Sequence, residues 1–323
     1  MPIFFYIPAQ YLPSVERQAS WTSGRIPELL GDGKAASAQS WIYQTWAEIR
    51  NSCDVELVTE IPREGVIVTL SNHLHHGFRA GTAQFVVAVA ADFLPHPGAH
   101  VQILQNPAHA RRLPGTHFVP HWPQPNLIGR DPSRSRVVET AAFFGDPNNL
   151  TREIADSAFH QLLLSELGVR FEIREAGRWH DFSKVDVAVA IRDFSRARHL
   201  GKPATKLYNA WLAGVPLIGG SDSAFSAEGT PGTDYLVARS PGEMLRQIRE
   251  LKETPAKRQA IVDAGALRAR ARSRDAVRKI WLDICQAVIP SRFSAWKKLS
   301  PVRRSLFWQS GRGAYFLDRT FRS

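Results

Sequence analysis

Short apolar runs alternate with longer amphipathic stretches through the first part of the chain. The amphipathic stretch over residues 37–51 predicts a helix, with Ser37 as a plausible N-cap because its hydroxyl can accept a hydrogen bond from the first turn. Strands that alternate with helices are typical of a Rossmann-like α/β domain. The predicted strands cover residues 3–7, 55–60, 65–70, 85–90 and 101–104.

A proline-rich stretch over residues 113–132 interrupts this pattern. Proline fixes φ and lacks a backbone donor, so neither a helix nor a central strand is expected there. We interpret the stretch as a crossing between two domains, with the boundary near residues 130–136. Its prolines are Pro114, Pro120, Pro123, Pro125 and Pro132.

The alternation resumes after the crossing and predicts a second α/β lobe. We expect an N-terminal Rossmann-like lobe over residues 1–132, a C-terminal lobe over residues 133–288, and a basic aromatic tail over residues 289–323 that in one interpretation crosses back to the first lobe. In the second lobe the predicted strands cover residues 139–144, 169–173, 185–191 and 216–219, and the predicted helices cover residues 151–167, 204–212, 241–251 and 255–288.

The composition is that of a globular protein, because 44% of the 323 residues are hydrophobic and 22% are charged. This length exceeds the usual size of a single core, which agrees with two domains. The longest strongly apolar run, residues 85–91, is far shorter than the roughly 20 residues of a membrane-spanning helix. Cys53 and Cys285 lie far apart without Cys-x-x-Cys spacing, so we expect structural thiols in a cytoplasmic protein.

Basic residues outnumber acidic ones by 41 to 30, which gives a formal net charge of +11. This balance favours anionic partners such as nucleotide diphosphates, acidic lipid surfaces or nucleic acid. The tail over residues 292–323 has eight basic residues and one acidic residue, so it supplies +7 of this charge. The tail is therefore expected either to contact an anionic membrane at its inner face or to pack on the first lobe with solvated cations.

A nucleic-acid module is a third interpretation of the tail, because aromatic side chains among cations can stack on bases. No RNA-binding or helix-turn-helix pattern accompanies these residues, so nucleic acid is not an expected partner. The candidate stacking residues are Trp296, Phe307, Trp308, Tyr315 and Phe316.

The most specific pattern is found over residues 202–219, which read Lys-Pro-Ala-Thr-Lys-Leu-Tyr-Asn-Ala-Trp-Leu-Ala-Gly-Val-Pro-Leu-Ile-Gly. Glycine ends the helix of this segment, and proline introduces the apolar strand that follows. The segment resembles the donor-site helix of GT-B glycosyltransferases, and the resemblance extends over about residues 137–290. It implies an α/β fold of two Rossmann-like lobes facing a cleft, with a nucleotide-sugar donor held mainly by the C-terminal lobe.

The resemblance implies a donor site at the start of this helix. A helix N-terminus at the carboxyl edge of a parallel sheet offers N–H groups to a diphosphate, and Lys206 would add a full charge. Arg192 would supply a second cation, in an arrangement similar to the Arg and Lys pair of metal-independent members, so no metal cofactor is expected. The other expected donor-binding residues are Gly145, Thr205, Asn209 and Tyr208, whose ring could stack on a base.

Structural roles stay open for the same residues. Lys206 could be a solvated charge on a helix that merely packs on the sheet, and Asp193 could pair with Arg192 at the surface. Gly145 could belong to a plain capped turn. Asn209 stands where many GT-B enzymes have a glutamate that holds the donor ribose, so the identity of the donor does not follow from the resemblance.

The loop over residues 71–79, Ser-Asn-His-Leu-His-His-Gly-Phe-Arg, follows a predicted strand at the carboxyl edge of the first sheet. Its His73 is expected to act as general base or to hydrogen-bond the donor sugar or phosphate. A solvated polar loop is the alternative, and the spacing of Cys, Asp and Glu does not support a metal site. The residues expected on the acceptor side are His76, Arg79, His121 and Trp122, of which the last two could equally pack the crossing.

These features predict a hexosyltransferase-type glycosyltransferase that moves a sugar from a nucleotide-sugar to a saccharide or lipid-linked acceptor in polysaccharide or glycolipid synthesis, without a metal. The alternative is a catalytically silent GT-B-like protein that binds sugar nucleotides or glycans, which Asn209 and the lack of an unambiguous base allow. The sequence has no Gly-x-Gly-x-x-Gly after a strand, which disfavours a nicotinamide or flavin oxidoreductase.

Overall fold

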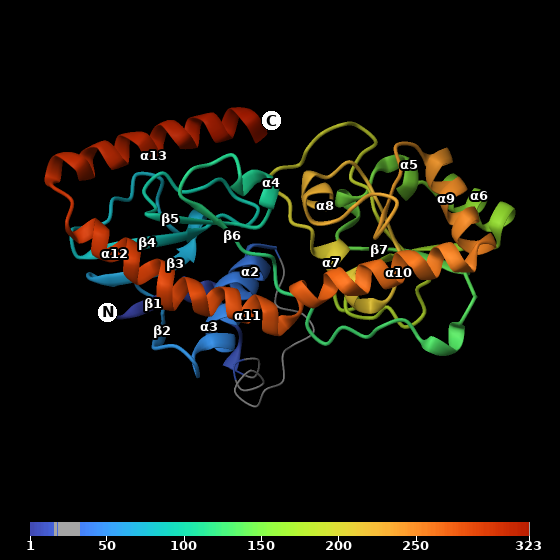
Figure 1. The fold of residues 1–323 in the computed structure, drawn as a ribbon, viewed down its shortest axis with the longest axis horizontal. Coiled ribbons are helices and arrows are strands. Elements are labelled where there is room, and N and C mark those ends of the chain that lie inside the picture. The colour runs from blue at the N-terminus through green and yellow to red at the C-terminus, as the bar shows by residue number, and fades with distance from the viewer. Residues whose placement is uncertain (16–17, 19–32, 323) are drawn as a thin grey trace. The chain divides into compact units, whose positions relative to one another are not determined.

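The computed structural model describes residues 1–15, 18 and 33–322 (Figure 1). The chain forms two compact units, and each is built from discontinuous segments. The predicted boundary at residue 132 follows the proline-rich stretch, whereas the division of the structure precedes Pro123. Unit 1 comprises Met1–Trp122, Leu200–Pro203 and Arg274–Ser323, and unit 2 comprises Pro123–His199 and Ala204–Ser273.

The described residues of unit 1 form a parallel sheet with the order β2-β1-β3-β4-β5-β6. Its central strands are buried on both faces, which explains why they read as continuous apolar runs rather than as alternating ones. The strands are β1 (Ile3–Tyr6), β2 (Val55–Val58), β3 (Gly65–Leu70), β4 (Gln84–Val89), β5 (Val101–Leu104) and β6 (Thr116–Phe118).

Helices from both ends of the chain complete the core of unit 1. Trp281, Phe293 and Trp296 are buried with Phe5 and Phe85, so the final helices belong to the same core as the first strand. Figure 1 shows these helices in orange and red beside the blue and cyan strands. The helices are α2 (Gly33–Ala38), α3 (Gln44–Ile49), α4 (Pro107–Ala110), α11 (Arg274–Asp283), α12 (Ile289–Lys297) and α13 (Pro301–Arg322), with π-helical turns η2 (Gln39–Tyr43) and η7 (Ile284–Val288) and 3-10 turns η1 (Ala9–Tyr11) and η3 (Ser71–His73).

The described residues of unit 2 form a second parallel sheet with the order β11-β10-β9-β7-β8. Apolar clusters cover its two faces, one around Phe143 and Val189 and the other around Ala188 and Leu207. The strands are β7 (Thr140–Phe144), β8 (Arg170–Arg174), β9 (Val187–Ala190), β10 (Leu217–Gly219) and β11 (Leu236–Val237). The α-helices are α5 (Arg152–Ala155), α6 (Ser157–Leu167), α7 (Thr205–Ala213), α8 (Ser223–Glu228), α9 (Pro241–Glu253) and α10 (Pro255–Ala269), with 3-10 turns η4 (Pro132–Arg134), η5 (Pro147–Asn149) and η6 (Arg270–Arg272).

Two predicted helices are interrupted in the structure. The helix predicted over residues 151–167 breaks at Asp156, which has an extended backbone and caps α6 by accepting a hydrogen bond from the Ala158 amide. The helix predicted over residues 255–288 breaks at the extended Ser273, and a π-helical turn precedes Pro290, which has no N–H to donate. Capping and proline thus override the amphipathic pattern.

One local prediction in unit 1 was wrong, and one edge strand was not predicted. Ser37 is not an N-cap, because it lies inside α2, whose first residue is Gly33. The proline-rich stretch contains the strand β6, which pairs with β5 at the edge of the sheet. An edge strand tolerates flanking prolines because only one of its sides needs backbone donors. Among the described residues, no helix combines the length and the apolar character needed to span a membrane.

Candidate functional site

The sheet of unit 2 has a topological switch point between β7 and β9. The chain leaves β7 for β8 on one side and later returns to β9 on the other side. In open α/β sheets the crevice at the carboxyl ends of such strands is the usual position of a ligand. Gly145 directly follows β7, and Arg192 lies just after β9, so both of these predicted site residues lie at this edge.

Arg192 is held in place by two polar neighbours. Its Nε donates to Asp222 Oδ1 at 3.2 Å, and its terminal nitrogen donates to Asn149 Oδ1 at 3.0 Å. The Asp222 carboxyl is buried after β10, and this burial raises its pKa, against the opposing effect of Arg192, His199 and Lys206 nearby. Arg192 therefore pairs with the buried Asp222 and not with Asp193 at the surface, and its guanidinium has a fixed position at the sheet edge.

Lys206 lies at the same edge, in the first turn of α7. Its ammonium lies 5.1 Å from the centroid of the Phe143 ring, at the end of β7. Gly145 has a φ of +150°, and a Cβ at this position would lie 3.2 Å from Lys206 Nζ. A side chain there would be strained and would crowd the ammonium, so glycine keeps the space around Lys206 open.

The N-cap residue of α7 provides no capping side chain. The N-cap position is Ala204, whose methyl side chain cannot accept from the first amides. Thr205 Oγ1 is buried and has no hydrogen-bond partner among the described residues. The first amides of α7, the Thr205 hydroxyl and the cations Arg192 and Lys206 form a set of donors that suits an anion. A diphosphate matches this set.

Tyr208 has a structural role instead of the predicted stacking on a base, and Asn209 makes one structural contact while its donor contact stays a prediction. The Tyr208 ring is fully buried, and its hydroxyl donates to Glu228 Oε2 at 2.9 Å, so neither ring face is accessible to a base. Arg272 also pairs with Glu228. Asn209 Oδ1 accepts from the Gln124 amide at 3.0 Å. These contacts join α7, α8 and the segment that enters unit 2.

His73 in unit 1 is a half-buried histidine in η3. Its Nδ1 lies 3.1 Å from Thr69 Oγ1, and its ring stacks on Tyr11 with centroids 5.4 Å apart. Burial lowers the pKa of His73 to about 4, so the ring is neutral at pH 7 but weakly basic. Its Nε2 is buried and lacks a partner among the described residues. These properties favour a hydrogen-bonding role over that of a general base.

The residues predicted for the acceptor side separate into two groups within unit 1. His76 and Arg79 are exposed, and both line a hollow of about 170 Å³. Trp122 is fully buried and its indole nitrogen donates to Thr45 Oγ1 at 3.0 Å, so it packs the core. His121 is half-buried and its ring meets Trp41 edge to face.

Sequence reasoning missed Asp222 and the role of Asn149 beside Arg192. Asp222 directly follows the predicted strand over residues 216–219, so the rule that ligands gather at carboxyl edges could have selected it. Among the described residues, no group of three or more His, Cys, Asp or Glu side chains is arranged to hold a metal ion.

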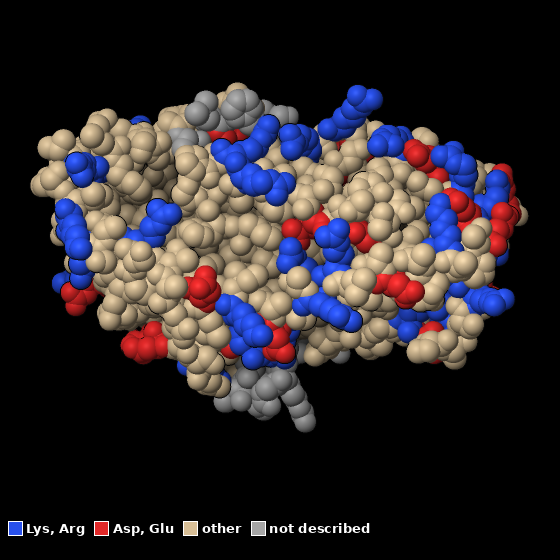
Figure 2. All heavy atoms as spheres, in the orientation of Figure 1, with Lys and Arg blue, Asp and Glu red and all other residues tan. Residues whose placement is uncertain are grey.

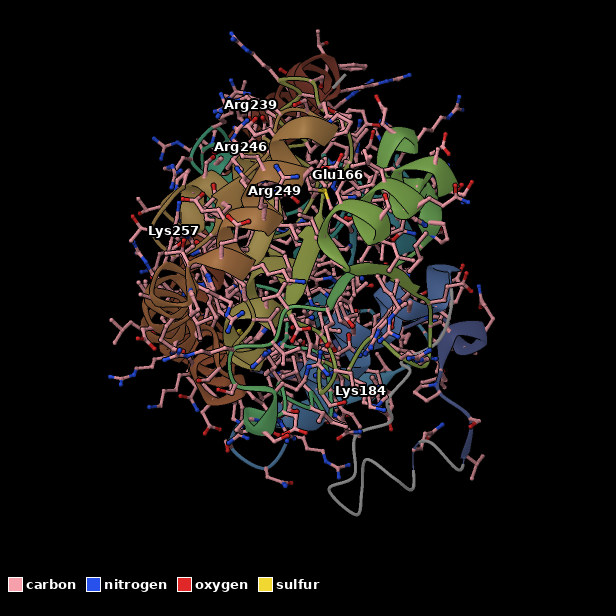
Figure 3. All side chains as sticks on the ribbon, turned by 90° about the vertical axis from the view of Figure 1, so that its right-hand side faces the viewer. Glu166, Lys184, Arg239, Arg246, Arg249 and Lys257 are labelled. Carbon is pink, nitrogen blue, oxygen red and sulfur yellow. The ribbon has the colours of Figure 1, made fainter. Side chains whose placement is uncertain are left out.

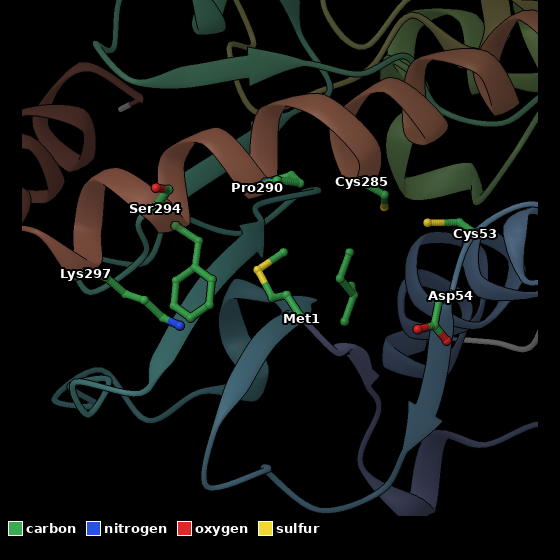
Figure 4. A pocket seen from close by; sticks show the side chains of 9 residues that line it. Met1, Cys53, Asp54, Cys285, Pro290, Ser294 and Lys297 are labelled. Carbon is green, nitrogen blue, oxygen red and sulfur yellow. The ribbon is translucent and has the colours of Figure 1, made fainter.

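A larger hollow of about 490 Å³ lies elsewhere in unit 1, between β1, β2 and α12 (Figure 4). Cys53 and Cys285 point toward one another at its rim. A hydrogen bond from the Cys285 thiol lowers the pKa of Cys53 to about 7, whereas the same contact and burial raise the pKa of Cys285. Cys53 is therefore a half-buried thiol with thiolate character, whereas Cys285 is a buried and inert thiol.

Iodoacetamide at pH 7 is expected to alkylate Cys53 about tenfold faster than Cys285, because the thiolate is the reactive form and Cys285 is buried. Peptide mass spectrometry of timed samples measures both rates in the native protein. In the Cys285→Ser variant, Cys53 keeps a hydroxyl neighbour and should stay reactive. Equal labelling of the two cysteines would contradict the assigned pKa order.

Comparisons with known proteins agree with this geometry. Residues 172–284 match the family model described as glycosyl transferase-like, and no curated protein sequence matches the chain. HepE of Anabaena, solved with UDP-glucose, is 13% identical with a TM-score of 0.57, over 90% of this chain and 100% of HepE. TarM of S. aureus is 9% identical with a TM-score of 0.53, over 70% of this chain and 56% of TarM.

AviGT4, a glycosyltransferase involved in avilamycin A biosynthesis, is 16% identical with a TM-score of 0.50, over 81% of this chain and 92% of AviGT4. The chain thus spans little more than half of TarM but nearly all of HepE and AviGT4. At these identities the shared property is the fold. The chain therefore has the fold of the GT-B glycosyltransferases, and its residues 172–284 are similar to the glycosyl transferase-like family.

Proposed function

We propose that the protein is a hexosyltransferase-type glycosyltransferase that moves a sugar from a nucleotide-sugar donor to a saccharide or glycolipid acceptor. The observation that carries this proposal is the set formed by Arg192, Lys206 and the start of α7 at the switch point of unit 2. HepE, whose fold the chain shares, binds UDP-glucose, which supports a nucleotide-sugar as the donor class.

The chemistry of sugar transfer explains why two cations are useful. The bond between the anomeric carbon and the diphosphate oxygen breaks, the acceptor oxygen bonds to that carbon, and the acceptor loses its proton. Negative charge grows on the leaving diphosphate during this step. Fixed cations stabilise it without reorganising, and Asp222 and Asn149 keep the Arg192 guanidinium in position. In this mechanism Arg192 and Lys206 replace a divalent metal.

We propose ligand-binding roles for three residues of unit 1. His73 hydrogen-bonds a sugar or phosphate group through Nε2, the nitrogen that has no protein partner among the described residues. His76 and Arg79 are exposed and contact the acceptor. We also propose that a glycolipid acceptor is reached from the cytoplasmic side, through peripheral contact with an anionic membrane.

A donor screen tests the proposal and the silent-binder alternative together. The protein is incubated with UDP-, GDP- and other activated sugars, and thermal shift and donor hydrolysis are both measured. A glycosyltransferase is expected to be stabilised by one nucleotide class and to hydrolyse its sugar donor slowly, with and without EDTA. Stabilisation without any turnover supports a silent binder. Turnover that disappears with EDTA and returns with Mg²⁺ or Mn²⁺ contradicts the role of the two cations.

A further inference from the structure

Helix α13 is fixed to unit 1 by one face. Phe307 stacks on His100 with ring centroids 5.2 Å apart, and Asp318 is buried in a pair with His109. A Cβ at Gly311 would lie 2.1 Å from the Pro97 carbonyl oxygen, so the helix approaches this loop as closely as a glycine allows. The inward face of α13 is therefore defined by contacts with the protein.

The opposite face of α13 is apolar and exposed. Val302 is 70% exposed, Leu306 57% and Phe316 53%, and helical periodicity brings them to one side together with the exposed Gln309 and Gly313. Asp318, the only carboxylate of the helix, is buried on the other side. In Figure 2 the surface over the first half of α13 is mostly uncharged, with isolated basic side chains.

Arginines flank this apolar face. Arg303 lies along one edge, and Arg312 and Arg319 lie along the other, all exposed. Apolar side chains between cationic edges are the pattern of helices that lie in a membrane interface, where the apolar groups enter the acyl boundary and the cations meet lipid phosphates. The charge of this helix is complementary to an anionic surface.

A hollow beside the Arg312 edge supplies a place for a lipid head group. Its volume is about 170 Å³, and Arg79 and Arg312 both line it. Trp308 and Gly98 form part of its wall, and a Cβ on Gly98 would lie 3.0 Å from the Trp308 ring. Phe316 follows Arg312 by one helical turn, so the hollow and the apolar face are continuous.

We propose that α13 docks the protein on an anionic phospholipid surface, with Leu306 and Phe316 in the acyl boundary and a lipid phosphate between Arg79 and Arg312. A nucleic acid fits this surface less well. Of the aromatic residues considered as stacking groups, Trp296 is buried, and Phe307 and Trp308 pack against His100. The exposed face has two aliphatic side chains, Val302 and Leu306, and one exposed ring, Phe316, which suits lipid better than a stack of bases.

The inference rests on the proposed function, because Arg79 is also proposed to contact the acceptor. Docking is measured by co-sedimentation of the full protein with vesicles, so it can fail while turnover persists, or the reverse. Vesicles of equal parts phosphatidylglycerol and phosphatidylcholine are compared with phosphatidylcholine alone, at 0.1 M and at 1 M salt, where the screening length falls from about 10 Å to about 3 Å. Preferential binding to the anionic vesicles that weakens at high salt is the expected result.

Two double variants separate the parts of the surface. Arg79→Ala/Arg312→Ala is expected to lower the partition coefficient about 30-fold, from about 1 kcal/mol for each arginine at the membrane. Leu306→Ser/Phe316→Ser is expected to lower it roughly tenfold, and both positions are exposed, so the fold should be retained. Circular dichroism checks helix content in each variant.

Arg239→Ala/Arg246→Ala is the matched control, because it removes the same charge from the surface of unit 2 (Figure 3). It is expected to bind like the parent protein. An equal loss in this control, equal recovery with both vesicle types, or preference for single-stranded nucleic acid over anionic vesicles overturns the proposal. Release from anionic vesicles by inorganic phosphate at constant ionic strength also overturns it, because the hollow would then bind the free ion instead of a lipid.

Discussion

The Lys206→Ala and Arg192→Ala variants are each expected to lose about 2 to 4 kcal/mol of transition-state stabilisation, measured as kcat with the nucleotide-sugar identified in a donor screen. The reason is that each side chain stabilises charge that grows on the leaving diphosphate. Circular dichroism checks the fold of each variant, because Arg192→Ala also removes the partner of the buried Asp222.

Two charge-matched variants serve as controls for this experiment. Lys184 and Arg246 are exposed in unit 2 and are labelled in Figure 3. The Lys184→Ala and Arg246→Ala variants are expected to keep the parent kcat and KM, so a general effect of lost positive charge can be recognised. If both Lys206→Ala and Arg192→Ala show the parent kinetics at saturating donor, the donor-site assignment is wrong.

The largest expected effect on stability concerns Asp186, at the start of the strand that leads to Arg192. Its carboxylate is fully buried and accepts hydrogen bonds from Arg130, Arg134 and the amides of Glu139 and Thr140. The Asp186→Asn variant is expected to lose about 3 kcal/mol of unfolding free energy, since it removes the charge between two arginines that are themselves mostly buried. Chemical denaturation measures the loss.

The pH dependence of this effect has a defined sign. Burial of Asp186 raises its pKa, but hydrogen bonds from Arg134, Glu139 and Arg130 outweigh burial and lower the pKa below its ordinary value. A lowered folded pKa means that the stabilisation is present above the unfolded pKa of about 3.9 and is lost as the pH falls through the folded pKa. The difference between parent and Asp186→Asn should therefore shrink in acid.

The exposed carboxylate of Asp263 provides the control for both measurements. It lies on α10 and accepts a hydrogen bond from Gln259, one turn earlier in the same helix. Asp263→Asn is expected to change stability by less than about 0.5 kcal/mol at any pH. A comparable loss in this variant, or a difference for Asp186→Asn that persists unchanged in acid, would contradict the assigned role of the Asp186 cluster.

The strands were largely predictable because buried parallel strands are continuous apolar runs, as in β3 and β4. The helix breaks were not predictable from periodicity, because they depend on single local interactions such as the Asp156 cap. The edge strand β6 was missed because its prolines dominate the local pattern, whereas pairing with β5 depends on the position of the whole sheet.

The candidate site was predictable where chain position alone fixes it. Arg192 and Lys206 each lie next to a strand end or a helix start, and both could be recognised from that position. The burial of Tyr208 and the pairing of Asp222 with Arg192 depend on which strands become neighbours, over separations of 20 and 30 residues in their hydrogen bonds. Secondary-structure propensity carries no information on such contacts. The sequence could therefore suggest roles for Tyr208 and Arg192 but could not decide between them.

The return of the chain to unit 1 at Arg274 has a consequence for the order of folding during synthesis. The core of unit 1 joins Phe5 to Trp281 and Phe85 to Phe293, so its closing contacts span more than two hundred residues. Unit 2 is made of residues that are nearly contiguous and emerge from the ribosome before Arg274. Contacts of high sequence separation form slowly. Unit 1 begins to be synthesised first but is completed last, because its central apolar strands are not covered until the final helices have been made.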